Sequence, residues 1–239
     1  MRNIFSRKSL VLYAILLLPT LLLGQGFGAG NYNYLDFQHK SYYFGISLGY
    51  NVSGYNLDHS EHFIRNDTFA ITQAKQGPGA HINIITNLKL GRYFDFRFVP
   101  GINFGNKTIE YQGLSGANTL SRKQFETVSV EAPFLLRFKS QPYHDMRLFV
   151  VGGVRYAYDV ANNSKSRQAD RLIKVSPHEF SFEAGAGIQL FFPYFIFSPE
   201  IRFSYGLGNL LIYNDKLEES SVLDKLLSQG ITITINLEG

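Results

Sequence analysis

One alternating pattern constrains the fold of this chain more than any other feature of its sequence. In residues 180–190 every second residue is apolar, and the residues between them are polar or glycine. The alternation recurs about eight times along the chain. A period of two residues is typical of a β-strand with one apolar and one polar face. The pattern therefore predicts an all-β protein.

The first 24 residues have the composition of an export signal. Three basic residues precede an apolar run, residues 10–23, and a plausible cleavage point follows at Gly24. An uncleaved anchor helix is the alternative, although the run is short for crossing about 30 Å of hydrocarbon. We predict a signal peptide over residues 1–24 and export through the Sec pathway.

The rest of the chain divides into a lead-in and one β-domain. Residues 25–39 show no periodicity and are expected to be flexible, whereas residues 40–239 carry all of the alternating segments. The predicted strands are residues 42–52, 79–90, 94–111, 125–139, 146–158, 180–190, 195–205 and 231–238.

The connections between these strands alternate in length. Short turns near residues 91–93, 140–145 and 192–194 alternate with long loops at residues 53–78, 112–124, 159–177 and 206–229. An even number of strands with this alternation is typical of outer-membrane barrels. We predict an eight-stranded antiparallel up-and-down transmembrane β-barrel, with four long extracellular loops and short periplasmic turns.

A soluble eight-stranded barrel with its apolar side chains inside is the alternative. Eight strands enclose a space only just wide enough for side chains to fill. The apolar faces are rich in Phe, Leu, Ile and Tyr, and the polar faces are rich in glycine. Bulky side chains therefore fit better outside, against lipid.

Composition excludes several classes of function. Without the three basic residues of the signal segment, 20 Lys and Arg stand against 19 Asp and Glu. Such a near-neutral chain gives no reason to expect nucleic acid as a partner. The chain has no cysteine, which excludes disulfides, a lipidated N-terminus and thiolate chemistry.

The polar faces of the predicted strands carry charged residues that would point into the barrel. They are Arg97, Glu131, Arg137, Arg155, Glu183, Glu200 and Arg202. An unpaired charge in a narrow interior is costly, so opposite charges there are expected to pair. A salt-bridged plug is the favoured interpretation, and a polar pathway or binding site is the alternative.

Catalysis finds little support in the sequence. The histidines are scattered, and only His81 lies clearly on the polar face of a predicted strand. A hydrolase would need a nucleophile, a base and an orienting carboxylate close together. We predict no enzymatic activity, no catalytic residue, no metal site, no cofactor and no small-molecule substrate.

The last long loop contains leucines at helical spacing among charged residues. The apolar positions are Leu217, Val222, Leu223, Leu226 and Leu227. Such spacing predicts a short amphipathic helix. The helix would either cap the mouth of the barrel or dock on a partner protein.

Three segments carry a likeness to known proteins. They are residues 42–49 (YYFGISLG), 129–139 (SVEAPFLLRFK) and 192–207 (FPYFIFSPEIRFSYGL). With these segments the chain resembles the PorT/SprT family of Bacteroidetes outer-membrane barrels. The likeness extends from about His39 to the C-terminus, although the last three residues lack the usual terminal aromatic.

The resemblance implies participation in type IX secretion. That system exports adhesins, proteases and gliding-motility proteins that carry a C-terminal sorting domain, and no enzymatic activity is attributed to the family. The matching segments contribute four residues of the predicted polar interior. These residues are Glu131, Arg137, Glu200 and Arg202.

Three functional hypotheses follow. The first is a non-enzymatic component of the type IX secretion system, with outer-membrane lipid and other secretion components as partners. The second is a stand-alone OmpA-like barrel that serves as an adhesin or stabilises the envelope. The third is a membrane enzyme that modifies lipid, which the charged interior disfavours.

Overall fold

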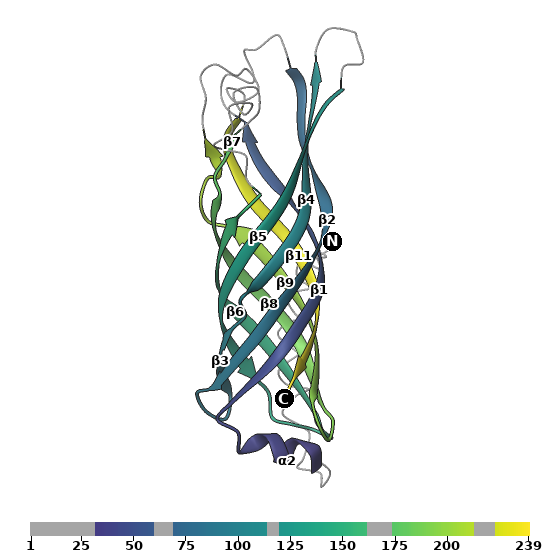
Figure 1. Ribbon diagram of the computed structural model, residues 1–239, viewed down its shortest axis with the longest axis vertical. Helices are drawn as coiled ribbons and strands as arrows, with labels where there is room; N and C mark the ends of the chain where they lie inside the picture. Colours follow the sequence, from purple (N-terminus) through teal and green to yellow (C-terminus); the bar gives the residue numbers. More distant parts are fainter. Residues whose placement is uncertain (1–31, 60–68, 114–119, 162–173, 213–222) are drawn as a thin grey trace, which may run out of the picture. The chain divides into compact units, whose positions relative to one another are not determined.

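The computed structural model describes residues 32–59, 69–113, 120–161, 174–212 and 223–239, and Figure 1 shows their arrangement. A single short helix, α2 (Tyr32–Gln38), precedes the strands of this part. The strands are β1 (Tyr42–His59), β2 (Phe69–Lys89), β3 (Phe94–Phe98), β4 (Gly101–Gly113), β5 (Leu120–Lys139), β6 (Met146–Asp159), β7 (Lys174–Val175), β8 (His178–Phe191), β9 (Ile196–Gly206), β10 (Leu211–Ile212) and β11 (Leu223–Glu238).

The sheet closes into a barrel because its first strand is paired on both edges. β1 pairs with β2 on one side and with β11 on the other, and all pairings are antiparallel. From β2 the pairing passes through β3 and β4 to β5, then through β6, β8 and β9 to β11. β7 and β10 form a separate two-stranded ribbon.

β3 and β4 together make one strand of the ring. Pro100 lies between them, and it cannot donate a backbone hydrogen bond to the sheet. The backbone pairing nevertheless continues past the break, since Ile84 N–H donates to the carbonyl of Pro100 at 2.8 Å. The predicted eight-stranded antiparallel barrel is therefore confirmed.

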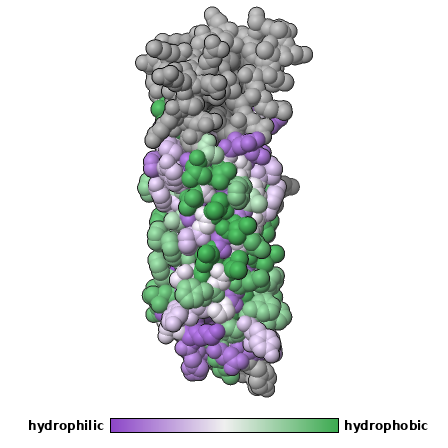
Figure 2. Space-filling model, viewed as in Figure 1, coloured by the Kyte–Doolittle hydropathy of each residue, from purple (hydrophilic) through white to green (hydrophobic). Residues whose placement is uncertain are grey.

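Apolar side chains cover the outside of the barrel wall. On β1, the outward residues Phe44, Ile46 and Leu48 are 48–56% exposed. Figure 2 shows similar apolar residues gathered along the barrel wall on one face. A continuous apolar surface of this kind is what lipid requires and water disfavours. The soluble alternative, which needs the apolar faces inside, is wrong.

Several strands are longer than the sequence pattern predicts. β1 continues to His59, β2 begins at Phe69, and β5 begins at Leu120. In the β1 extension the described outward residues are polar, as at Asn56 and Asp58. The apolar alternation therefore ends where a strand leaves the lipid, although backbone pairing continues. For this reason the loops predicted at residues 53–78 and 112–124 begin too early and end too late, whereas the loop predicted at residues 159–177 lies between β6 and β8 as expected.

The lead-in is not without structure. Residues 25–39 were expected to be flexible, but residues 32–38 form α2. Phe37 of this helix is buried in a cluster with Tyr43, Phe191 and Ile196. Seven residues are too few to give a periodic sequence pattern, and a helix this short depends on such packing. No helix in the described part of the chain is long and apolar enough to cross a membrane.

Polar anchors hold both ends of α2 against the barrel. The carboxylate of Asp145 accepts a hydrogen bond from the Tyr34 backbone N–H at 3.0 Å. At the other end, the Lys89 ammonium group donates to the carbonyl of Phe37. An anion near the N-terminus and a cation at the C-terminus both complement the helix dipole. In Figure 1, α2 lies at the end of the barrel with the short turns, here called the short-turn end.

The prediction of an amphipathic helix in the last loop is wrong for those of its residues that the structure describes. Leu223, Leu226 and Leu227 belong to β11, which pairs with β1 as far as His59. Leu226 is buried, and the next residue points to the opposite face. Strand pairing thus overrides a helical spacing. Leu217 and Val222 lie outside the described residues.

Candidate functional site

Twelve charged side chains inside the barrel form one network of ion pairs. The cations are Arg97, Lys107, Arg137, Lys139, Arg155 and Arg202, and the anions are Asp95, Glu131, Glu179, Glu183, Glu200 and Glu238. Six positive charges thus stand against six negative ones. We call this set the lumen network.

Strand geometry explains why these side chains point inward. On β5, Glu131, Arg137 and Lys139 are separated by even numbers of residues, so all three face the same side of the sheet. The same holds for Glu200 and Arg202 on β9. All five side chains are buried. The alternation that exposes apolar residues to lipid therefore delivers charged residues to the interior.

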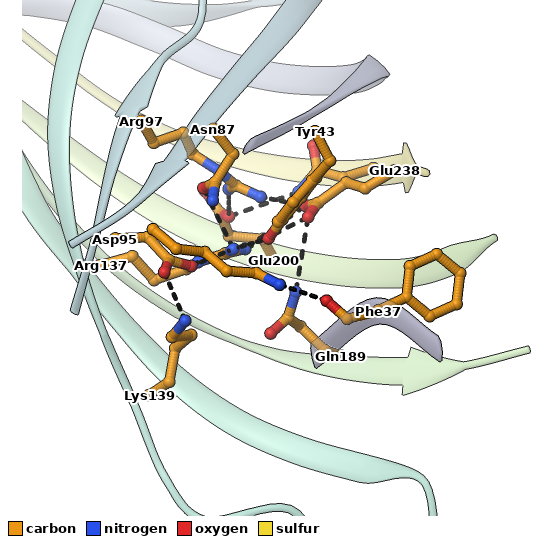
Figure 3. A network of polar contacts seen from close by, with 12 residues as sticks. Phe37, Tyr43, Asn87, Asp95, Arg97, Arg137, Lys139, Gln189, Glu200 and Glu238 are labelled. Atoms are coloured by element: carbon orange, nitrogen blue, oxygen red, sulfur yellow. Dashed lines mark hydrogen bonds and ion pairs between the residues drawn. The ribbon is translucent and has the colours of Figure 1, made fainter. Parts of the chain in front are cut away.

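The half of the lumen network nearer the short-turn end is centred on Arg137, which is fully buried (Figure 3). Its guanidinium group lies 2.6 Å from Asp95 Oδ2 and 3.4 Å from Glu238 Oε2. It also donates to the hydroxyl group of Tyr43. Asp95 also forms an ion pair with a second cation, the ammonium group of Lys139. Each buried charge here has at least one opposite charge beside it.

Arg97 joins the two halves of the lumen network. One of its terminal nitrogens pairs with Glu238, and the other lies 2.7 Å from Glu200 Oε2. Figure 3 shows Arg97 among these carboxylates, which come from β11 and β9. A guanidinium group suits this position because it presents several donors in a fixed plane.

The other half of the lumen network continues from Glu200. Arg202 lies 2.8 Å from Glu200 and 2.9 Å from Glu183, although the contact with Glu200 is not aligned as a hydrogen bond. Arg155 then pairs with Glu183 at 3.5 Å through Nε and with Glu131 at 3.1 Å through one terminal nitrogen. The last members are Glu179, 2.7 Å from Arg155, and Lys107, 3.6 Å from Glu179.

All seven charged residues predicted for the interior lie in the lumen network. Five further members were not among the predicted residues. They are Asp95, Lys107, Lys139, Glu179 and Glu238. Asp95 and Glu238 occupy polar positions in the predicted strands, so the alternation alone could have identified them. Lys107 and Glu179 lie near the long-loop end, where the apolar pattern fades. The signal there is only their even spacing from inward residues.

The lumen network fills the barrel. Its members Arg97, Arg137, Lys139 and Glu238, and the neighbouring Gln189, are each 2% exposed or less. An eight-stranded barrel has room for little more than such side chains. In the described part of the chain, no group of His, Cys, Asp or Glu is placed to hold a metal ion. The arrangement can therefore brace the wall and block the lumen.

Reconstituted in a planar lipid bilayer, the protein should show no steady ion conductance. The reason is that paired, buried side chains occupy the space through which ions would pass. Conductance would be recorded at several voltages, with a 16-stranded porin as the conducting control. A reproducible conductance step from the pure protein would contradict a closed lumen.

A comparison with protein-family models agrees with the barrel geometry. Residues 30–211 match the family model described as outer membrane protein beta-barrel domain. The outer membrane protein OprG from Pseudomonas aeruginosa is 12% identical, with a TM-score of 0.48 over 84% of this chain and 96% of that chain. The attachment invasion locus protein Ail of Yersinia pestis is 14% identical, with a TM-score of 0.39 over 84% and 100% of the two chains. No curated protein matches the chain.

Proposed function

Since this chain belongs to the family of outer-membrane β-barrel proteins, we propose that it is a closed, non-enzymatic barrel that acts through contacts with other proteins. The lumen network is the observation that carries this proposal. In the part of the chain that the structure describes, a neutral set of paired charges leaves no open path for a solute and no apolar chamber for a lipid substrate. The remaining working surfaces are the two ends and the lipid-facing wall.

We further propose a role in type IX secretion, needed for export of cargo with C-terminal sorting domains. This part rests on the resemblance to the PorT/SprT family. The three segments that carry the resemblance supply Tyr43, Glu131, Arg137, Glu200 and Arg202, all of which contact one another directly or through the lumen network. Residues 1–24 would direct export through the Sec pathway, and the short-turn end would face the periplasm.

In a strain that lacks the gene for this protein, cargo with sorting domains should be retained in the periplasm. The amount of cargo in the medium and in the periplasm would be measured by immunoblot. Re-expression of the wild-type chain should restore release, and an unrelated periplasmic marker would report leakage of the envelope. Normal cargo release by the deletion strain would exclude the secretion role.

A stand-alone surface protein is the second candidate, and one observation favours it. β1, β2, β4, β5 and β11 remain paired beyond the apolar part of the wall. Their ends would project from the membrane as a structured surface suited to adhesion. If this candidate holds, the deletion strain will release cargo normally but adhere less to surfaces or neighbouring cells.

A further inference from the structure

A cavity of about 590 Å³ opens at the short-turn end, between α2 and the adjoining strand ends. Its lining includes five cationic side chains and no carboxylate. They are Lys40, Lys89, Arg92, Lys139 and Arg147. We call this space the mouth cavity. Its volume is typical of a site for a small molecule.

Arg147 is the most unusual group of the mouth cavity. It is only 5% exposed, and it pairs with no carboxylate of the described residues. Its Nε atom has no hydrogen-bond partner there. The guanidinium group instead lies over the rings of Tyr34 and Phe191, 4.6 Å and 5.5 Å from their centroids. Such contacts offset only part of the cost of burying a cation.

The neighbouring charges leave this cation uncompensated. Asp95 lies nearby but already pairs with Lys139 and Arg137. Asp145 accepts hydrogen bonds from Tyr34 N–H and from Asn33 of α2. Asp36 of α2 is exposed at the surface. Among the described residues the lumen network is electrically balanced, so the mouth cavity has an excess of positive charge from the four lining cations outside that network.

Three more cations surround the opening. Lys89 donates to the carbonyls of Phe37 and Gln38. Lys40 lies over the Phe37 ring at 4.9 Å, and Arg92 lies over the ring of a neighbouring tyrosine at 5.7 Å. None of the three forms an ion pair with a carboxylate in the described ranges. Together with Arg147 they offer donors around one space.

We propose that the mouth cavity binds a phosphate group, with Arg147 as the buried recognition residue. Phosphate fits better than a single carboxylate because its oxygens can accept hydrogen bonds from several cations at once. Apolar residues share the lining, among them Leu90 and Ile196. Leu90 is 59% exposed and adjoins the lipid-facing wall.

The phosphate could belong to a phospholipid headgroup or to a soluble phosphate ester. Both would place the same anion against Arg147. The lipid source is suggested by the position of the mouth cavity at the edge of the apolar wall. This inference uses the barrel geometry and does not depend on the secretion role.

The test uses the full chain in a detergent without phosphate groups. Binding of solubilised phosphatidylglycerol, of glycerol 3-phosphate and of inorganic phosphate would be measured by native mass spectrometry and by thermal shift. Arg147→Met should weaken binding about ten- to a hundredfold, the range expected for charge-assisted hydrogen bonds. Lys225→Met, which removes an exposed cation from the long-loop end, is the matched control and should bind like the wild type.

A second readout separates recognition from a purely structural role. Without ligand, Arg147→Met should melt no lower than the wild type, because the substitution removes an unpaired buried charge. Binding of phosphatidylglycerol without binding of glycerol 3-phosphate would support a lipid source, and binding of glycerol 3-phosphate with equal or higher affinity would support a soluble one. The proposal would be overturned if no probe bound, or if Arg147→Met bound the probes as tightly as the wild type. It would also be overturned if only a phosphate-free acidic peptide displaced a bound probe from the mouth cavity.

Discussion

Replacing Arg97 by methionine should lower the free energy of unfolding by about 3–5 kcal/mol, the usual cost of breaking a buried ion pair. Arg97 is 1% exposed and contacts both Glu200 and Glu238. Its loss leaves five cations against six carboxylates in the lumen network. Unfolding in urea would be followed by the mobility difference between folded and heated protein on a gel.

Two further variants make this expectation specific. Glu126→Gln changes an exposed carboxylate on the outside of β5 and should alter stability by no more than about 0.5 kcal/mol. The double variant Arg97→Met with Glu200→Gln restores equal numbers of charges. It should be more stable than Arg97→Met alone by about 1–3 kcal/mol. If the double variant loses as much free energy of unfolding as the two single variants together, charge balance plays no role.

Replacing Gly185 by valine should cost about 2–4 kcal/mol of stability. A Cβ atom on Gly185 would lie 2.6 Å from Cγ of Arg202 and 2.4 Å from the carbonyl oxygen of Ile201. The side chain of Arg202 would have to move away from Glu183 and Glu200. Overpacking and loss of ion pairs thus act together, and chemical unfolding would measure their sum.

The matched control lies one residue further along β8. Ala186 is exposed on the outside of the wall, where a larger apolar side chain meets lipid. Ala186→Val should therefore change stability by less than about 0.5 kcal/mol. If Gly185→Val unfolds like the wild type, Arg202 has more room than the distances indicate, and the lumen is less tightly filled.

The barrel could be predicted because its physics is repeated in every strand. Lipid on one side and a narrow lumen on the other force apolar and polar residues to alternate, as in Phe44 and Gly45 or Phe203 and Ser204. This rule also identified Arg97 and Glu200 as inward residues. What it could not supply was the partner of each charge, because pairing depends on the stagger between strands.

The other differences between prediction and structure occur where this alternation is absent. α2 is held in place by Asp145 and Lys89, which are distant in sequence, so no local sequence pattern predicts the helix. Near the long-loop end, the outward residues are polar, and strand and loop have similar compositions there. The unpaired Arg147 was also missed, since a lone cation in a sequence carries no sign of whether a carboxylate lies beside it.

The pairing of β1 with β11 has a consequence for the order of assembly. Gly45 is paired with Glu238, so the first and the last strand of the barrel meet. Contacts of such large sequence separation carry a high closure entropy and form slowly. Until they form, both outer strands have open edges that could pair with other chains. The barrel can therefore seal only after β11 has been delivered, and the unsealed intermediate needs protection in the meantime.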